Sequence, residues 1–113
     1  MIKVALVDDH QLIRTGLRSL LDSDPGLHVI AEASNGAEAL EVLASERADV
    51  VLMDLSMPVM DGVEATARLR ESQPGVRVVV LTSFSDRARV QEAIGAGAIG
   101  YLLKDCEPSE LVN

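Results

Sequence analysis

The chain has 113 residues, of which 48% are hydrophobic, 25% charged and 2% aromatic, and its formal net charge is -8. This length and apolar content predict one globular domain and exclude a disordered chain. A single cysteine excludes a disulfide scaffold, and no apolar run reaches the ~18 residues of a membrane helix. The N-terminus lacks the form of a signal peptide, so we expect a cytoplasmic protein with no membrane partner.

Apolar runs of strand length alternate with helical patterns along the whole chain. In chain order the patterns predict a strand over 2–7, a helix over 11–22, a strand over 29–33, a helix over 36–45, a strand over 50–53, a helix over 62–72, a strand over 76–81, a helix over 86–95 and a strand over 101–103. A fifth helix is expected to begin near Pro108 and to be incomplete at Asn113.

Local signals support several of these boundaries. Five residues of the first helix are expected to share its apolar face: Leu12, Ile13, Leu17, Leu20 and Leu21. Asp61 is expected to cap the third helix, with Glu64 in capping-box position. The glycines at 95 and 97 are interpreted as a helix stop and a tight turn into the fifth strand, not as a phosphate-binding loop.

Alternating strands and helices with right-handed crossovers predict an α/β fold, a flavodoxin-like doubly wound sheet of five parallel strands. The expected strand order is 2-1-3-4-5, with the fifth helix truncated. Three of the strands lack polar alternation, which is typical of strands buried on both faces. Ligands of such sheets bind beyond the carboxyl ends of the strands, where strands 1 and 3 flank the switch point.

Polar residues of a particular kind follow these carboxyl ends. Asp8 and Asp9 follow the first strand, Asp54 the third, Thr82 the fourth and Lys104 the fifth. Carboxylates a few ångströms apart repel by up to ~4 kcal/mol per pair at an effective dielectric near 20, so a cation is expected among them. Mg²⁺ suits such oxygen ligands, and a metal, a lysine and a hydroxyl around a carboxylate predict phosphoryl transfer to that carboxylate.

The motifs in which these residues stand resemble the receiver domain of two-component response regulators, the CheY-like family. They are Val7-Asp8-Asp9-His10, Met53-Asp54-Leu55-Ser56-Met57-Pro58 running on to Met60-Asp61-Gly62, Leu81-Thr82-Ser83 and Tyr101-Leu102-Leu103-Lys104-Asp105. The Asp-Asp-His opening, followed by Arg14-Thr15-Gly16-Leu17, is similar to the NarL/FixJ-type subfamily. That subfamily carries a C-terminal helix-turn-helix domain, which residues 1–113 do not contain, so DNA is expected as a partner only through that missing domain.

The resemblance implies a role for each matching residue. Asp54 would accept a phosphoryl group from a sensor histidine kinase. Asp9 would be the principal Mg²⁺ ligand, with Asp8 acting partly through water, joined by Asp54 and the backbone carbonyl of Ser56. Lys104 and Thr82 would bind the phosphoryl oxygens. Tyr101 would be the aromatic switch that moves inward when Thr82 is drawn toward the phosphate.

Weaker expectations concern four further positions. Ser56 and Phe84 match the family positions that tune phosphoryl lifetime, and Phe84 is expected to shield the acyl phosphate from water. His10 is expected to be an ordinary helix-start residue, with a place beside the acidic residues as the alternative. Cys106 is expected to be a loop thiol.

Two other functions stay open at this point. A Mg²⁺-dependent phosphohydrolase also forms an aspartyl phosphate, but would use an Asp-x-Asp motif and an insertion that holds the substrate. A flavodoxin-like flavin protein needs hydroxyls after the first strand and aromatics that stack on the ring. The chain is expected to be no enzyme beyond self-phosphorylation and slow autodephosphorylation, and to form a homodimer through the sheet face that the truncated helix would leave uncovered.

Overall fold

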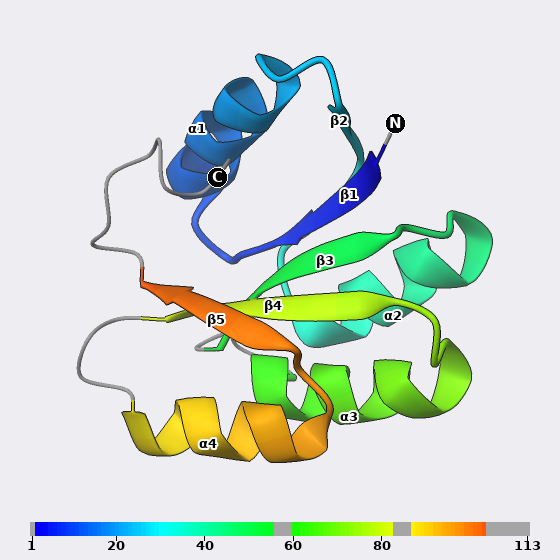
Figure 1. The fold of residues 1–113 in the computed structure, drawn as a ribbon, viewed down its shortest axis with the longest axis vertical. Helices are drawn as coiled ribbons and strands as arrows, with labels where there is room; N and C mark the ends of the chain where they lie inside the picture. The colour runs from blue at the N-terminus through cyan, green and yellow to red at the C-terminus, as the bar shows by residue number, and fades with distance from the viewer. Residues whose placement is uncertain (1, 56–59, 83–86, 104–113) are drawn as a thin grey trace.

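The computed structural model describes residues 2–55, 60–82 and 87–103 (Figure 1). The elements follow in the order β1 (Ile2–Val7), α1 (Gln11–Asp22), β2 (Leu27–Ala33), α2 (Gly36–Ser45), β3 (Val50–Asp54), α3 (Gly62–Ser72), β4 (Arg77–Thr82), α4 (Arg87–Ala96) and β5 (Gly100–Leu103). The first three helices have the predicted bounds. The expected start of the fourth helix at residue 86 and the whole fifth helix lie outside the described residues.

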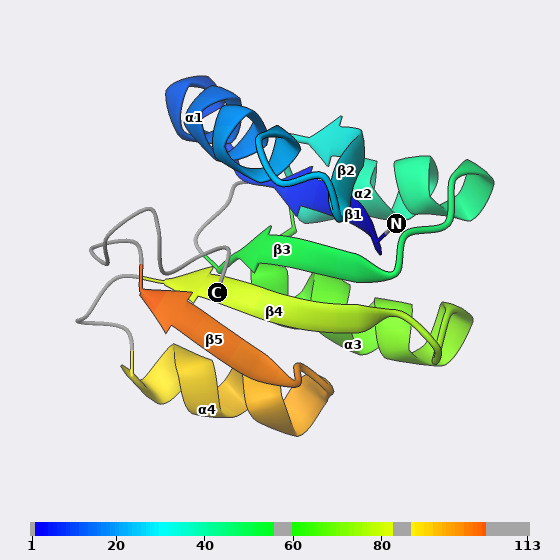
Figure 2. The same cartoon turned by 45° about the horizontal axis from the view of Figure 1, so that its top comes forward.

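The sheet confirms the predicted fold class. Its five strands are ordered β2-β1-β3-β4-β5, and every neighbouring pair is parallel. Because all strands run the same way, their carboxyl ends gather at one edge; the arrowheads of β3, β4 and β5 meet at the left of Figure 2. The chemistry predicted for the carboxyl ends therefore has one common location.

Helices cover the two faces of the sheet unequally. Within the described residues, α1 packs on one face, where its Leu17 and Leu21 contact a cluster that includes Leu6 and Leu52. The helices α2, α3 and α4 pack on the other face, around a larger cluster that includes Met53. Alternate residues of β1, β3 and β4 enter opposite clusters, which explains why these strands are apolar without polar alternation.

The predicted apolar face of α1 was wrong at Leu12, and Ile13 on that face is also 36% exposed. Leu21 is buried, with 3% of its surface exposed, but Leu12 is 85% exposed. At about 100° per residue, nine positions separate the two leucines by about 180°, so they lie on opposite sides of the helix. Leu12 therefore contributes nothing to the core formed by the described residues.

The predicted helix boundaries at Asp61 and Gly97 are confirmed. The Asp61 carboxylate accepts a hydrogen bond from the Glu64 backbone N–H at 3.0 Å, which caps α3. Gly97 has a φ of 122°, and the Ala98 N–H donates to the Ala93 carbonyl at 3.0 Å. This bond and the positive φ form a Schellman motif, which ends α4 and turns the chain into β5.

Among the helices of the described ranges, none combines the length and the apolarity that a membrane span requires.

Candidate functional site

The acidic site, our name for Asp8, Asp9 and Asp54, lies where β1 and β3 end side by side. Val7 of β1 registers with Met53 of β3, so Asp8 and Asp54 are the next residues of adjacent strands. Both are buried: 1% of Asp8 and 2% of Asp54 is exposed. The Asp9 side chain is 29% exposed, so it forms the solvent side of the acidic site.

Asp54 is the last residue of β3, whereas the sequence pattern placed it just after the strand. It continues the parallel ladder in register with Leu81 of β4, and the N–H of Leu55 donates to the Leu81 carbonyl at 3.3 Å. The pattern ended the strand at Met53 because that is the last apolar residue. A carboxylate on a regular strand is held more firmly than one on a turn, so the position of the Asp54 carboxylate is well fixed.

Asp8 is held from several sides. Its N–H donates to the Ala33 carbonyl of β2 at 3.0 Å. Its Oδ1 accepts a hydrogen bond from the His10 backbone N–H at 2.8 Å. The guanidinium of Arg14 donates to its carbonyl oxygen. Backbone and side chain of Asp8 are thus both positioned by neighbouring elements.

Sequence reasoning gave Arg14 no role in the acidic site. Its side chain is only 16% exposed, and its Nε lies 3.3 Å from a carboxylate oxygen of Glu32 on β2. Arg18 pairs with the other Glu32 oxygen, and this hydrogen bond raises the pKa of Arg18 above its ordinary value. The signal available in the sequence was the spacing of these arginines, four residues apart and so on one side of α1.

His10 does more than begin α1. It is the N-cap residue, but its side chain makes no capping hydrogen bond. Instead its Nδ1 lies 3.1 Å from Asp9 Oδ1 and 3.3 Å from Asp8 Oδ1. The expectation of an ordinary helix-start histidine was therefore wrong, and the alternative, a histidine that lines the acidic residues, holds.

The donor set of the acidic site fits a divalent cation. One ligand atom each from Asp8, Asp9, His10 and Asp54 lies within 4.8 Å of all the others. Two ligands on opposite sides of an octahedral Mg²⁺ are about 4.2 Å apart, so these atoms are already close to the spacing a metal ion requires. Three carboxylates also supply the charge that a hard dication prefers.

Thr82 and Tyr101 lie on neighbouring strands, as expected. Thr82 is the last residue of β4 and registers with Leu103, while Tyr101 registers with Val80, two residues earlier on β4. The pattern ended the fourth strand one residue too early, so Thr82 ends β4 instead of following it. Tyr101 is 54% exposed.

The remaining predicted site positions lie outside the described residues. They are Ser56, Met57, Pro58, Phe84, Lys104 and Cys106.

Two glycines fix the ends of the segment that follows Asp54. A Cβ on Gly62 would lie 2.3 Å from the Asp54 carbonyl oxygen, and a Cβ on Gly36 would lie 2.7 Å from the Met60 carbonyl oxygen. The N–H of Gly62 donates to the Leu55 carbonyl at 3.1 Å, and that of Gly36 to the Met60 carbonyl at 3.0 Å. The close approach explains why Gly62 carries no side chain and shows that this glycine packs directly against the backbone of Asp54.

Arg89 ties α4 to the same segment, a role that sequence reasoning missed. Its Nη2 donates to the Leu55 carbonyl at 3.0 Å and lies 3.0 Å from Asp61 Oδ2. The residue after Asp54 is therefore hydrogen-bonded to a side chain of α4. No sequence period indicates such a contact, because 34 residues separate its partners.

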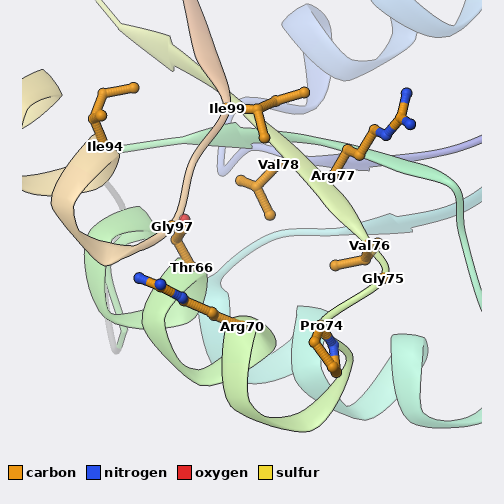
Figure 3. A pocket seen from close by; sticks show the side chains of 10 residues that line it. All are labelled: Thr66, Arg70, Pro74, Gly75, Val76, Arg77, Val78, Ile94, Gly97 and Ile99. Atoms are coloured by element: carbon orange, nitrogen blue, oxygen red, sulfur yellow. The ribbon is translucent and has the colours of Figure 1, made fainter.

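A hollow with a volume of about 370 Å³ lies at the edge of the sheet opposite the acidic site (Figure 3). It lies between the ends of α3 and α4 and the start of β4, and its lining includes Arg70, Arg77, Ile94 and Ile99. The two guanidinium groups point away from each other in Figure 3, so they do not form one anion site.

Comparison with known proteins gives one consistent result. Residues 4–113 match the family model for the response regulator receiver domain. The transcriptional regulatory protein LnrK of Bacillus subtilis (strain 168) is 47% identical over 113 residues, covering 100% of this chain and 51% of LnrK. The nitrate/nitrite response regulator protein NarL of Escherichia coli (strain K12) is 41% identical over 110 residues, covering 97% of this chain and 51% of NarL. The chain thus spans about half the length of these curated relatives.

Solved structures agree. A two-component response regulator of the LuxR family from Aurantimonas sp. SI85-9A1 superposes with a TM-score of 0.93 at 38% identity, covering 99% of this chain and 80% of that one. The receiver domain of AraT, a response regulator from Geobacillus stearothermophilus, superposes with a TM-score of 0.88 at 40% identity, covering 97% of this chain and 86% of that one. These matches favour the signalling function over the phosphohydrolase and flavin alternatives. The chain belongs to the response regulator receiver domain family, and it is a receiver domain of the NarL-like, LuxR-family type of two-component response regulator.

Proposed function

We propose that Asp54 accepts a phosphoryl group from a phosphohistidine of a sensor histidine kinase, and that this modification switches the domain between two states. One observation carries the proposal: the buried Asp54 carboxylate lies within 4.8 Å of donor atoms from Asp8, Asp9 and His10, at the carboxyl edge of the sheet. Such a concentration of negative charge is costly unless the acidic site binds a cation and a reacting group.

The acidic site would hold Mg²⁺ through Asp9 and Asp54, with Asp8 acting partly through water and the backbone carbonyl of Ser56 completing the protein ligands. When bound, the metal neutralises the charge of the carboxylates and of the phosphoryl oxygens. The hydrogen bond from Asp8 to the Ala33 carbonyl and those that Asp8 accepts from His10 and Arg14 keep Asp8 in place, so the protein supplies a preorganised half of the coordination shell.

In the transfer itself, an Oδ atom of Asp54 attacks the phosphorus of the phosphohistidine. The new P–O bond forms as the P–N bond breaks, and the electron pair of that bond stays on the imidazole nitrogen of the kinase. The Thr82 hydroxyl and the Lys104 ammonium would bind phosphoryl oxygens. The product carries about one more negative charge than the free carboxylate, which draws these donors inward.

Movement of Thr82 toward the phosphoryl group would free space for Tyr101. The two residues lie on adjacent strands: Thr82 ends β4, and Tyr101 of β5 registers with Val80, two residues before Thr82. The phosphoryl group shifts the equilibrium between the two positions of Thr82 and Tyr101 only as far as it interacts better with one of them than with the other.

The output of the switch is proposed to be transcriptional. The curated relatives are transcriptional regulators about twice as long as this chain, so a DNA-binding domain outside residues 1–113 would make the DNA contact. We also propose that the receiver domain forms a homodimer and that the exchange with the kinase takes place in the cytoplasm, where the single cysteine would stay reduced.

Acetyl phosphate with Mg²⁺ tests the acceptor. The wild-type chain should gain one phosphoryl group per molecule by mass spectrometry, and Asp54→Asn should gain none. Asp49→Asn is the matched control: Asp49 precedes β3 at its other end, and an amide oxygen can still accept the hydrogen bond from the Lys3 N–H. Incorporation into Asp54→Asn at the wild-type level would overturn the proposal, as would repeated turnover that releases many phosphates per chain.

A further inference from the structure

The imidazole of His10 faces the acidic site. As N-cap of α1 it makes no side-chain capping bond, and its ring is 62% exposed. An exposed ring of this kind could extend into solvent, yet its Nδ1 lies between Asp8 Oδ1 and Asp9 Oδ1 at 3.3 and 3.1 Å.

These distances are those of adjacent ligands on one metal ion. Two donor atoms at right angles, each about 2.1 Å from a metal, are about 3.0 Å apart. The backbone N–H of His10, bonded to Asp8 Oδ1 at 2.8 Å, fixes the residue in this position. The nitrogen that lies beside the two carboxylates is therefore placed to share a cation with them.

A nitrogen donor changes which cation is preferred. Mg²⁺ favours oxygen ligands alone, whereas imidazole favours first-row transition dications such as Co²⁺ and Ni²⁺. We infer that His10 is a specificity-determining metal ligand, which makes the acidic site select first-row transition dications over Mg²⁺. This inference rests on the proposed metal site and adds His10 to its protein ligands.

Calorimetric titration with CoCl₂ and with MgCl₂ at one fixed pH tests the inference. His10→Asn keeps a residue that N-caps well and replaces imidazole nitrogen with amide oxygen. We expect it to lose at least about tenfold in Co²⁺ affinity, since even indirect partners of metal ligands contribute that much, and to change Mg²⁺ affinity by less than about threefold.

The second histidine of the chain gives the matched control. His28 lies on β2 at the start of the strand, it is exposed, and no other histidine is present. His28→Asn should bind both ions as the wild type does. In proton NMR spectra of the wild type, Co²⁺ should shift the His10 ring resonances strongly and leave those of His28 near their metal-free positions.

The outcomes separate this inference from the proposed function. Equal Co²⁺ affinity in the wild type and His10→Asn, or unshifted His10 resonances at Co²⁺ saturation, would overturn the role of His10 and leave the Mg²⁺ site intact. Failure of Mg²⁺ to bind the wild type, or Mg²⁺ binding that survives Asp9→Asn unchanged, would instead overturn the proposed metal site. Unshifted His10 resonances of the wild type would overturn the inference even where the variant is poorly folded.

Discussion

The Arg89 guanidinium of α4 donates to the carbonyl oxygen of Leu55, the residue directly after Asp54, at 3.0 Å. It also lies 3.0 Å from the Asp61 carboxylate that caps α3. One side chain therefore connects the residue next to Asp54, the start of α3 and the helix α4. A change at the Asp54 carboxylate would have a short bonded route to α4.

We expect Arg89→Met to lower the free energy of unfolding by about 1.5–3 kcal/mol, because charged hydrogen bonds of this kind contribute that much. Arg68→Met is the control, since Arg68 pairs with Glu64 on the exposed side of α3 and should contribute about 0.5 kcal/mol or less. Urea denaturation of both variants measures the difference. Equal losses would mean that the Leu55 contact adds nothing to an ordinary surface pair.

Gly62→Ala should damage the acceptor side. The added Cβ would lie 2.3 Å from the Asp54 carbonyl oxygen, so backbone must move, at a cost of about 1–3 kcal/mol. We also expect slower phosphoryl uptake from acetyl phosphate. Gly16→Ala is the control: it is helical with nothing within 4 Å of the new Cβ, and it should stabilise the chain by about 0.5–1 kcal/mol. In thermal denaturation the midpoint should therefore fall for Gly62→Ala and rise for Gly16→Ala.

Mg²⁺ should stabilise the folded chain. At one hundred times its dissociation constant, an ion that binds only the folded state adds about 2.7 kcal/mol to the free energy of unfolding. Asp9→Asn should lose most of this gain, because Asp9 is a proposed Mg²⁺ ligand. Its exposed carboxylate can be changed with little harm to packing, so the metal-free variant should fold as the wild type does. Thermal denaturation with Mg²⁺ and with a chelator checks this, and Asp49→Asn should respond like the wild type.

The two leucines on opposite sides of α1 should differ sharply. Leu21→Ala removes a buried side chain and should cost about 2–5 kcal/mol. Leu12→Gln, at a residue that is 85% exposed, should change the stability of the monomer by about 0.5 kcal/mol or less. A stability cost above about 2 kcal/mol for Leu12→Gln in a monomeric protein would show that Leu12 is packed. Sedimentation equilibrium of Leu12→Gln also tests whether this apolar side chain supports the proposed homodimer, and a weaker dimer is expected.

Much of the fold and of the acidic site could be predicted from residue order alone. The spacing of apolar residues distinguishes strands from helices. The rule that parallel strands share a carboxyl edge then predicts that Asp8, Asp9 and Asp54 lie together. Errors of one or two residues at strand ends, as at Asp54 and Thr82, arise because backbone pairing continues past the last apolar side chain.

The positions of His10, Arg14 and Arg89 depended on the tertiary structure. A histidine at a helix start can face solvent or carboxylates with the same sequence around it, and which of the two it faces depends on how the folded backbone orients Asp8, Asp9 and His10. Arg89 and Leu55 are 34 residues apart, and no local periodicity encodes a contact at that separation. Residue order therefore determined which chemical groups share an edge, because strands that alternate with helices along the chain run parallel. Only the folded structure decided which of them touch, because contact distances depend on how separate elements pack.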